Sequence, residues 1–272
     1  MAAKLYAALD VSLNKVAICA MDHEGNLVHE TEVAACPDAI AAVLRVHQDQ
    51  LERVGLEAGP TSEWLVRELA KRCIDAVLME TRQAHKALSA MTVKTDRSDA
   101  RGLAHLLRMG WFRPVHVKTI SAREQRVRLA ARETLVRQVR DLENSVRGLL
   151  RSFGLRIPVL LRGRWSAAIR ALIEGHPSLP IIFEPLLQAR DALREHLAAL
   201  DRQVRDAARE DRVCRQLMTA PGVGAIVAMT FRTTIDDPHR FRSSRSVGAF
   251  LGLTPKRYQS GETAGRRHQQ SW

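Results

Sequence analysis

Four acidic residues are the part of this sequence best suited to chemistry. Asp10 lies within the apolar segment LYAALDVS, Glu57 ends the segment VGLE, and Asp96 and Asp99 belong to KTDRSDA. Propensity disfavours an aspartate in an apolar strand, so Asp10 indicates a function or a specific partner. If a helix begins near Thr95, Asp96 and Asp99 lie on one face, about one turn apart. Carboxylate oxygens are preferred ligands of Mg²⁺ and Mn²⁺, so four convergent acids would bind such an ion.

Each acid also has a simpler interpretation. Two carboxylates in the first turn of a helix are stabilised by the positive end of the helix dipole. A D-x-x-D pair taken alone is therefore better explained by helix stability than by metal binding. The metal hypothesis depends on whether other elements bring Asp10 and Glu57 to Asp96 and Asp99.

The first hundred residues predict elements that do so. Two apolar, β-branched segments and the alternating LVHETEVA, with the turn DHEGN between the last two, predict three antiparallel strands. The elements expected next are a helix over 38–52, a short strand ending at Glu57, a helix over 60–72, a strand over 75–81 and a helix from about Thr95.

This order, β-β-β-α-β-α-β-α, resembles the α/β fold of ribonuclease H and of RuvC-type nucleases. Asp10 is on the first strand, Glu57 ends the fourth, and Asp96 and Asp99 are on the last helix. In proteins of that fold, acids from these elements converge on one or two Mg²⁺ ions. A pair of ions about 4 Å apart stabilises the attacking and leaving oxygens of a phosphodiester.

The charge distribution indicates a polyanionic partner. The chain has a net charge of +12, and residues 113–170 hold fourteen arginines and lysines against four acids. Residues 240–272 add seven basic residues against Glu262. Nucleic acid is the first candidate, and a merely solvated basic surface is the alternative. Aromatic residues make up only 4% of the chain, which argues against single-strand binding by base stacking.

No apolar run approaches the roughly 20 residues that span a bilayer, and the N-terminus lacks the regions of a signal peptide. We therefore expect no membrane partner and a cytoplasmic location, associated with the nucleoid if DNA is bound. The four cysteines have no metal-ligand spacing and are expected to be reduced thiols.

The middle of the chain, 119–212, predicts two long helices. Apolar residues follow a heptad pattern from Leu135 to Leu149, and again in a second helix that is expected to begin near Pro185. The two helices form either an antiparallel helical hairpin within one chain or a dimerising coiled coil. Their outward-facing arginines either contact phosphates or are simply solvated.

The C-terminal part contains two further candidate sites. The segment PGVG, with Gly222 and Gly224, lies between apolar helical runs and matches the helix–hairpin–helix pattern, in which backbone N–H groups approach a phosphate. A glycine turn between packed helices would look the same. The helix SVGAFLGL then leads into an expected basic loop around Ser260. The basic residues there that are expected to contact nucleic acid are Lys256, Arg257, Arg266 and Arg267.

From spacing alone, Ser260 is a weak candidate for a nucleophile. A serine hydroxyl becomes nucleophilic only when it is deprotonated or oriented, and neighbouring cations would bind a phosphate rather than activate the hydroxyl.

Taken in order, the segments LDVS, LEAG, KTDRSDA, PGVG and FLGLTPKRYQSGE resemble the DEDD-type insertion-sequence transposases, the family described as bridge-RNA-guided recombinases. The resemblance covers nearly the whole chain. It implies a RuvC-like catalytic domain over 1–118, a basic coiled-coil connector over 119–212 and a small, mainly α-helical transposase domain over 213–272.

The resemblance also implies roles for individual residues. Asp10, Glu57, Asp96 and Asp99 bind Mg²⁺ (or Mn²⁺), and Ser260 is the nucleophile that forms a covalent link to a DNA end. The implied partners are the DNA of the element ends and target, a structured guide RNA, and further copies of the chain in a dimer or tetramer.

The end of the sequence departs from the family pattern. The family continues after Y-x-S-G into a basic stretch and further helices, whereas this sequence reads GETAGRRHQQSW and stops at Trp272. We therefore expect an incomplete C-terminal domain, which puts full transposition activity in question. Two alternatives stay open: a hydrolytic nuclease of the Holliday-junction-resolvase type, in which Ser260 is incidental, and a catalytically dead remnant that binds nucleic acid.

Overall fold

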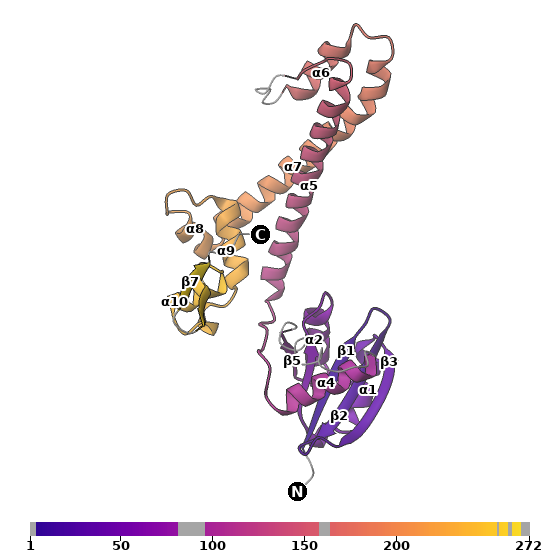
Figure 1. The fold of residues 1–272 in the computed structure, drawn as a ribbon, viewed down its shortest axis with the longest axis vertical. Coiled ribbons are helices and arrows are strands. Elements are labelled where there is room, and N and C mark those ends of the chain that lie inside the picture. The colour runs from indigo at the N-terminus through magenta and orange to yellow at the C-terminus, as the bar shows by residue number, and fades with distance from the viewer. Residues whose placement is uncertain (1–3, 81–95, 158–163, 255, 261–262, 268–272) are drawn as a thin grey trace. The chain divides into compact units, whose positions relative to one another are not determined.

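The computed structural model describes residues 4–80, 96–157, 164–254, 256–260 and 263–267; the side chain of Asp96 and those beyond Thr254 are outside the description. The chain divides into two compact units, Met1–Lys118 and Thr119–Trp272. Figure 1 shows the elements of each unit. A further division of the second unit near residue 212 stays a prediction.

The N-terminal unit is built on a five-stranded sheet in the order β3-β2-β1-β4-β5. Its strands are β1 (Leu5–Val11), β2 (Lys15–Asp22), β3 (Leu27–Ala34), β4 (Leu51–Glu57) and β5 (Ala76–Met79). Strand β2 is antiparallel to both β1 and β3, while β4 is parallel to β1 and β5 is parallel to β4. These directions and this order are those of the ribonuclease-H fold, so the predicted fold class is confirmed for this unit.

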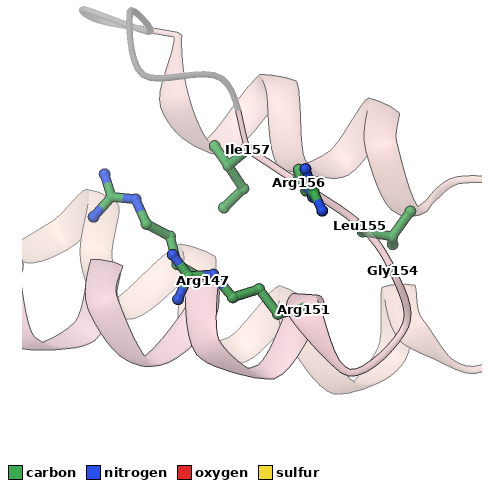
Figure 2. Close-up of a pocket in the computed structure, with 6 residues that line it drawn as sticks. All are labelled: Arg147, Arg151, Gly154, Leu155, Arg156 and Ile157. Carbon is green, nitrogen blue, oxygen red and sulfur yellow. The ribbon is translucent and has the colours of Figure 1, made fainter.

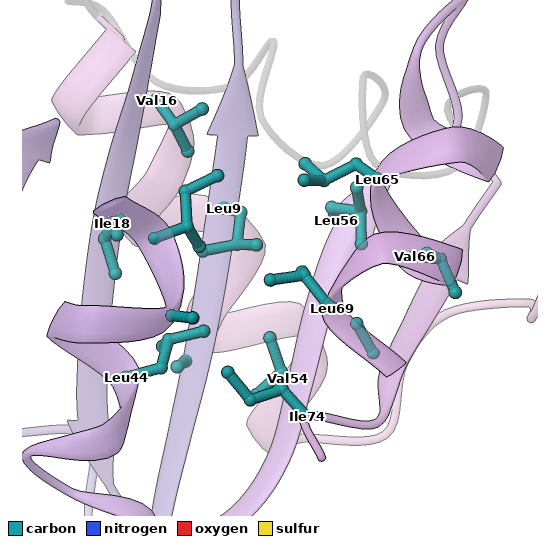
Figure 3. Packing of buried hydrophobic residues seen from close by; sticks show 14 of the residues in the cluster. Leu9, Val16, Ile18, Leu44, Val54, Leu56, Leu65, Val66, Leu69 and Ile74 are labelled. Carbon is teal, nitrogen blue, oxygen red and sulfur yellow. The ribbon is translucent and has the colours of Figure 1, made fainter. Parts of the chain in front are cut away.

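Helices cover both faces of the sheet. On one face, α1 (Pro37–Arg45) and α2 (Ser62–Ala70) cover a core that includes Leu9, Leu56 and Leu65, as Figure 3 shows. On the other face lies α4 (Asp96–Arg108), whose apolar side packs on the alternate residues of the same strands. Because β1 is buried from both sides, its sequence reads as an almost continuous apolar run.

The predicted helix over 38–52 is wrong in its second half. Helix α1 ends at Arg45, and after a single 3₁₀ turn the chain enters β4 at Leu51. Leu51 pairs with Leu5 of β1. Strand pairing in the centre of the sheet therefore outweighs the helix propensity of this segment.

The second unit contains a long antiparallel helical hairpin. It is formed by α5 (Ile120–Arg151) and α7 (Leu179–Glu210). Two ion pairs define its direction: Arg132 binds Asp201, and Glu143 binds Arg190. Eleven residues forward on α5 correspond to eleven residues backward on α7. The hairpin is thus formed within one chain.

The end of the hairpin has its own core, to which α6 (Trp165–Ile173) contributes. Arg190 is buried there, with its guanidinium 4.9 Å from the centre of the Trp165 ring. The predicted start of α7 near Pro185 is wrong, because the helix begins at Leu179 and Pro185 lies inside it. Burial of Leu179, Phe183 and Leu187 along one face outweighs the hydrogen bond that Pro185 cannot donate.

The C-terminal part of this unit contacts the other end of the hairpin through its first two helices. Its elements are α8 (Arg212–Leu217), α9 (Ala225–Ile235), a 3₁₀ turn (Pro238–Arg240), α10 (Ser244–Phe250), β6 (Lys256–Ser260) and β7 (Thr263–Arg267). Asp236, at the end of α9, accepts hydrogen bonds from the N–H and hydroxyl groups of Thr119, the N-cap of α5. The start of α5 is thereby tied to the end of α9.

The expected basic loop around Ser260 is wrong in form. Residues 256–260 and 263–267 pair as an antiparallel hairpin, with Ser260 at the end of β6. The Ser-Gly dipeptide between two short polar runs is a turn signal of the kind that joins two strands.

No helix among the described residues is long and apolar enough to cross a membrane.

Gly55 is required by the close packing of α4 on β4. A Cβ atom at this position would lie 2.8 Å from Cδ1 of Leu107, a fully buried residue of α4. We expect Gly55→Ala to lower the free energy of unfolding by about 1–3 kcal/mol, because the buried leucine has little room to move. Urea unfolding of the purified chain measures this change. Gly59→Ala is the control, since a Cβ there meets nothing within 4 Å, and an equal loss in both variants would contradict the packing explanation.

Candidate functional site

Strand pairing places Asp10 and Glu57 next to each other. In the parallel pair β1–β4, Leu9 is opposite Leu56, so the residues that follow them are neighbours at the carboxyl ends of the two strands. Neighbouring strands are about 4.8 Å apart. Both side chains are half-buried. Like charges on adjacent strands raise the free energy of the folded state, and a bound divalent cation would lower it.

The two acids also share one face of the sheet. Side chains alternate between faces along a strand, so Asp10 is on the side of Ala8, which is buried beneath α4. Glu57 is on the side of Gly55, which the Leu107 side chain of α4 covers. The face that carries both carboxylates is therefore the face on which α4 packs.

The direction of α4 brings its acidic first turn to the same edge. At its C-terminal end, Arg108 donates a hydrogen bond of 2.9 Å to the carbonyl of His23, in the turn after β2. That turn lies beside the start of β1, where Asp22 pairs with Leu5. The N-terminal end of α4 accordingly lies toward the other end of β1, where Asp10 is.

Asp96 and Asp99 occupy this first turn. Asp96 is the first residue of α4, and its side chain lies outside the described residues, as does the whole of Thr95. Asp99 is half-buried. Ala100 and Leu103, on the apolar side of the helix, are buried against the sheet.

An ion pair fixes α4 across the sheet. The guanidinium of Arg101 donates two hydrogen bonds, of 2.6 and 2.7 Å, to the carboxylate of Glu30 on β3. These bonds hold the pKa of Glu30 below its usual value. Beneath them, burial raises the pKa of the Cys19 thiol to about 11, with the Glu30 carboxylate adding to the shift. Cys19 therefore stays protonated and unreactive at neutral pH.

The described side chains do not by themselves form a complete metal site. Among them, no group of three or more His, Cys, Asp or Glu residues is arranged to hold a metal ion. Asp96, one of the four expected ligands, is not part of that set. The donor chemistry fits a hard cation, because Asp10, Glu57 and Asp99 offer only carboxylate oxygens. The ligand roles of all four acids stay predictions.

The C-terminal candidates lie in the second unit. Gly222 adopts a left-handed conformation with φ of 82°, and Gly224 is the N-cap of α9. The predicted pair of helices separated by a glycine turn is therefore present, while phosphate binding by that turn stays a prediction.

Ser260 and the four basic residues near it lie on the β6–β7 hairpin. Lys256 is opposite Arg267, and Arg257 is opposite Arg266. Their side chains are outside the description, so the roles expected of Ser260 and of these cations stay predictions.

Sequence analysis did not single out Gly55, which permits the close approach of α4 and so helps to position Asp99. A signal was present, because a glycine inside a strand pattern indicates close approach of another element. Sequence analysis also did not separate the arginines at the end of the helical hairpin from the other basic residues of 113–170.

A sheet of this order, with neighbouring acids on two parallel strands and a helix packed on the face that carries them, defines a ribonuclease-H-type α/β protein. The family follows from two family models. The model DEDD_Tnp_IS110, described as "Transposase", matches residues 7–154, more than half of the chain. The model of the "Transposase IS116/IS110/IS902 family" matches residues 214–272. The chain belongs to the IS110-type family of DEDD transposases.

Individual relatives agree with this assignment. A transposase for insertion sequence element IS1111A from Coxiella burnetii is 27% identical over 62% of this chain and 47% of its own length. A probable family 20 transposase from Pseudomonas aeruginosa is 30% identical over 62% of this chain and 51% of its own. A putative transposase from Sinorhizobium fredii, y4qE, is 28% identical over 96% of this chain and 66% of its own length. The chain spans about half the length of the first of these relatives.

Among solved structures, RuvC of Thermus thermophilus superposes with a TM-score of 0.32 and 14% sequence identity. The alignment covers 41% of this chain and 99% of RuvC. The strand order and directions of the sheet define the fold.

The Glu30–Arg101 pair predicts a pH-dependent contribution to stability. We expect Glu30→Gln to lower the free energy of unfolding by about 1 kcal/mol at pH 7. Because the folded-state pKa of Glu30 is lowered, the contribution is present above the usual glutamate pKa. It is lost as the pH falls through the lowered value, so the variant and the wild type should converge in acid.

Urea unfolding at pH 7 and at successively lower pH measures this difference. Glu32→Gln is the matched control, because Glu32 lies on the same strand but pairs with Lys15, whose side chain is 66% exposed. A larger effect from Glu32→Gln than from Glu30→Gln, or a Glu30 effect that persists in acid, would contradict the role given to the ion pair.

Proposed function

We propose that this protein is an insertion-sequence transposase that cuts and rejoins DNA strands with metal-binding acids and a serine nucleophile. The observation that carries the proposal is the placement of Asp10 beside Glu57 on the face under α4, in a chain of the DEDD transposase family. The relatives are named transposases. We infer the same activity for this chain, which spans about half the length of the first of these relatives.

In the proposed mechanism, Asp10, Glu57, Asp96 and Asp99 would bind Mg²⁺ or Mn²⁺. When bound, such an ion supplies positive charge at the attacking and leaving oxygens of a phosphodiester. The protein's part is to hold the carboxylates in fixed positions. Asp10 and Glu57 are on strands in the middle of the sheet, where Asp10 pairs with Ala17 of β2 and Glu57 pairs with Met79 of β5. Such rigid elements position functional groups precisely enough for chemistry.

Ser260 is proposed as the nucleophile, on the strength of the family resemblance. Its hydroxyl oxygen forms a bond to a DNA phosphorus as the bond from phosphorus to the leaving oxygen breaks. The hydroxyl proton passes to solvent, and the leaving oxygen takes up a proton to become the free hydroxyl of the other DNA end. The covalent link retains the energy of the phosphodiester, so strands can be rejoined without ATP. The partners in this proposal are DNA, a structured guide RNA and further copies of the chain, acting on the nucleoid.

The acids can be tested one at a time. Asp10→Asn and Glu57→Gln each keep the shape of the side chain while removing one negative charge. We expect each to reduce Mg²⁺-dependent strand cutting at least 100-fold, because charge stabilisation at the reacting phosphate is lost. The assay combines purified protein with labelled DNA and the RNA of its element. Unfolding curves check that the variants fold, and full cutting by either variant would contradict the metal-binding role.

The serine has a separate test. We expect the wild-type protein to form a covalent protein–DNA adduct at Ser260, detected by denaturing electrophoresis and mass spectrometry, and Ser260→Ala to form none. An adduct that persists in Ser260→Ala refutes the serine mechanism. If Ser260→Ala still cuts DNA while Asp96→Asn does not, the protein is a hydrolytic nuclease of resolvase type. Salt-sensitive binding without any cutting would identify it as an inactive nucleic-acid-binding protein.

A further inference from the structure

The end of the helical hairpin contains a hollow of about 570 Å³ whose polar lining is supplied by arginines. Figure 2 shows its lining, with Arg147 and Arg151 on α5 and Arg156 on the segment that returns over the helix. The residues that line it are Arg147, Arg151, Gly154, Leu155, Arg156 and Ile157.

A glycine turn creates the hollow. Helix α5 ends at Arg151, and Gly154 then takes a left-handed conformation with φ of 73°. The N–H of Leu155 returns to the carbonyl of Leu150 at 3.1 Å, which closes the end of the helix. The chain therefore reverses at once, and Arg156 comes to lie against the same hollow as the last two turns of α5.

The positive charge of this arginine hollow is poorly compensated within the protein. Arg151 and Arg156 are exposed, and neither side chain forms a hydrogen bond or an ion pair with any residue that the structure describes. Arg147 donates to the amide oxygen of Asn144 at 3.0 Å and is 3.9 Å from Glu143. The carboxylate of Glu143 lies closer to Arg190, at 2.7 Å.

Helix stability accounts for only part of this arrangement. A cation in the last turn of a helix interacts favourably with the helix dipole, which explains Arg151. Arg156 lies beyond the helix, and Arg147 is one turn before Arg151, outside the last turn. Three guanidinium groups around one hollow therefore call for an external anion.

The same face of α5 carries more arginines. Arg137, Arg140, Arg147 and Arg151 follow one another at intervals of three, seven and four residues, which places them on one side of the helix. Arg137 and Arg140 are exposed. From Arg137 to Arg151 the row is about 21 Å long. Its partner is accordingly an extended anion rather than a small one.

We propose that the arginine hollow and this row bind the phosphodiester backbone of a nucleic-acid double helix. The planar guanidinium group matches the oxygens of a phosphate. The other side chains of the hollow, Leu155 and Ile157, are aliphatic and offer no ring on which a base could stack. Contact is therefore to the backbone and independent of base sequence. A double helix carries one phosphate per strand about every 3.4 Å of its axis, so phosphates of both strands fall within the length of the row.

This inference goes beyond the proposed chemistry, because it concerns binding by the helical hairpin and needs neither a metal ion nor the acids of the first unit. It shares with the proposed function only the assumption that the partner is a nucleic acid.

The test is the salt dependence of binding by the full chain, measured in EDTA with a 20-base-pair DNA duplex and with an RNA duplex of the same length. The logarithm of the binding constant falls linearly with the logarithm of the salt concentration. We expect the double variant Arg151→Gln/Arg156→Gln to make this slope less steep by about 1.8, or about 0.9 for each lost phosphate contact. At 0.1 M salt this corresponds to binding that is on the order of 10- to 100-fold weaker. Both side chains are exposed, so the thermal unfolding curve should shift by no more than the loss of the favourable interaction of Arg151 with the helix dipole.

The matched control is Arg202→Gln/Arg205→Gln. These two arginines are exposed on α7, and neither side chain forms a hydrogen bond or an ion pair with a described residue. Their replacement removes the same charge. We expect the control to keep the wild-type slope. An unchanged slope in the hollow variant on both duplexes overturns the proposal, as does an equal loss in the control. A reduced slope on one duplex alone supports the proposal and identifies the bound backbone as DNA or RNA.

Strand cutting with Mg²⁺ is measured on the same preparations. Wild-type protein that binds a duplex through the hollow but never cuts would contradict the proposed transposase chemistry and leave the arginine hollow intact. If the hollow variant keeps the wild-type salt slope and still cuts DNA, the binding proposal fails and the proposed transposase chemistry stands.

Discussion

The parallel pairing of β1 with β4 is the constraint on which the candidate site depends. It brings together two acids that are 47 positions apart in the sequence, Asp10 and Glu57, because each directly follows a residue of the pair Leu9–Leu56. The side chain of Leu107 can lie over β4 only because position 55 has no side chain. Packing, rather than attraction between the acids and α4, therefore decides where the acidic start of the helix lies.

In the helical hairpin, buried charged residues align the two helices. Arg190 is buried, and it is retained in a core by Glu143 and Asp191 and by the face of Trp165. A buried ion pair gives little net stability compared with apolar residues of the same volume, but losing one partner is costly. These pairs therefore specify one alignment of α5 against α7. Because Glu143 is engaged inside, the arginines that surround the hollow remain available to an external anion.

The sequence predicted elements whose pattern is local. Strand alternation and turn residues placed Asp10 and Glu57 on the correct strands, and Asp96 and Asp99 lie in a helix, as predicted. Errors arose where distant contacts decide the outcome: pairing with β1 converts residues 51–52 from helix to strand, and the core at the end of the hairpin extends α7 back past Pro185. The arginine hollow depends on one reversal at Gly154, which composition alone does not locate.

The two ion pairs of the hairpin have a consequence for how its length can change in evolution. Arg132–Asp201 and Glu143–Arg190 are separated by the same number of residues on each helix. An insertion or deletion between them in one helix would rotate and shift every later side chain out of alignment with the other. Length changes in this region of the hairpin are thus tolerated only in matched pairs, so homologues should show coordinated gaps in their alignments here.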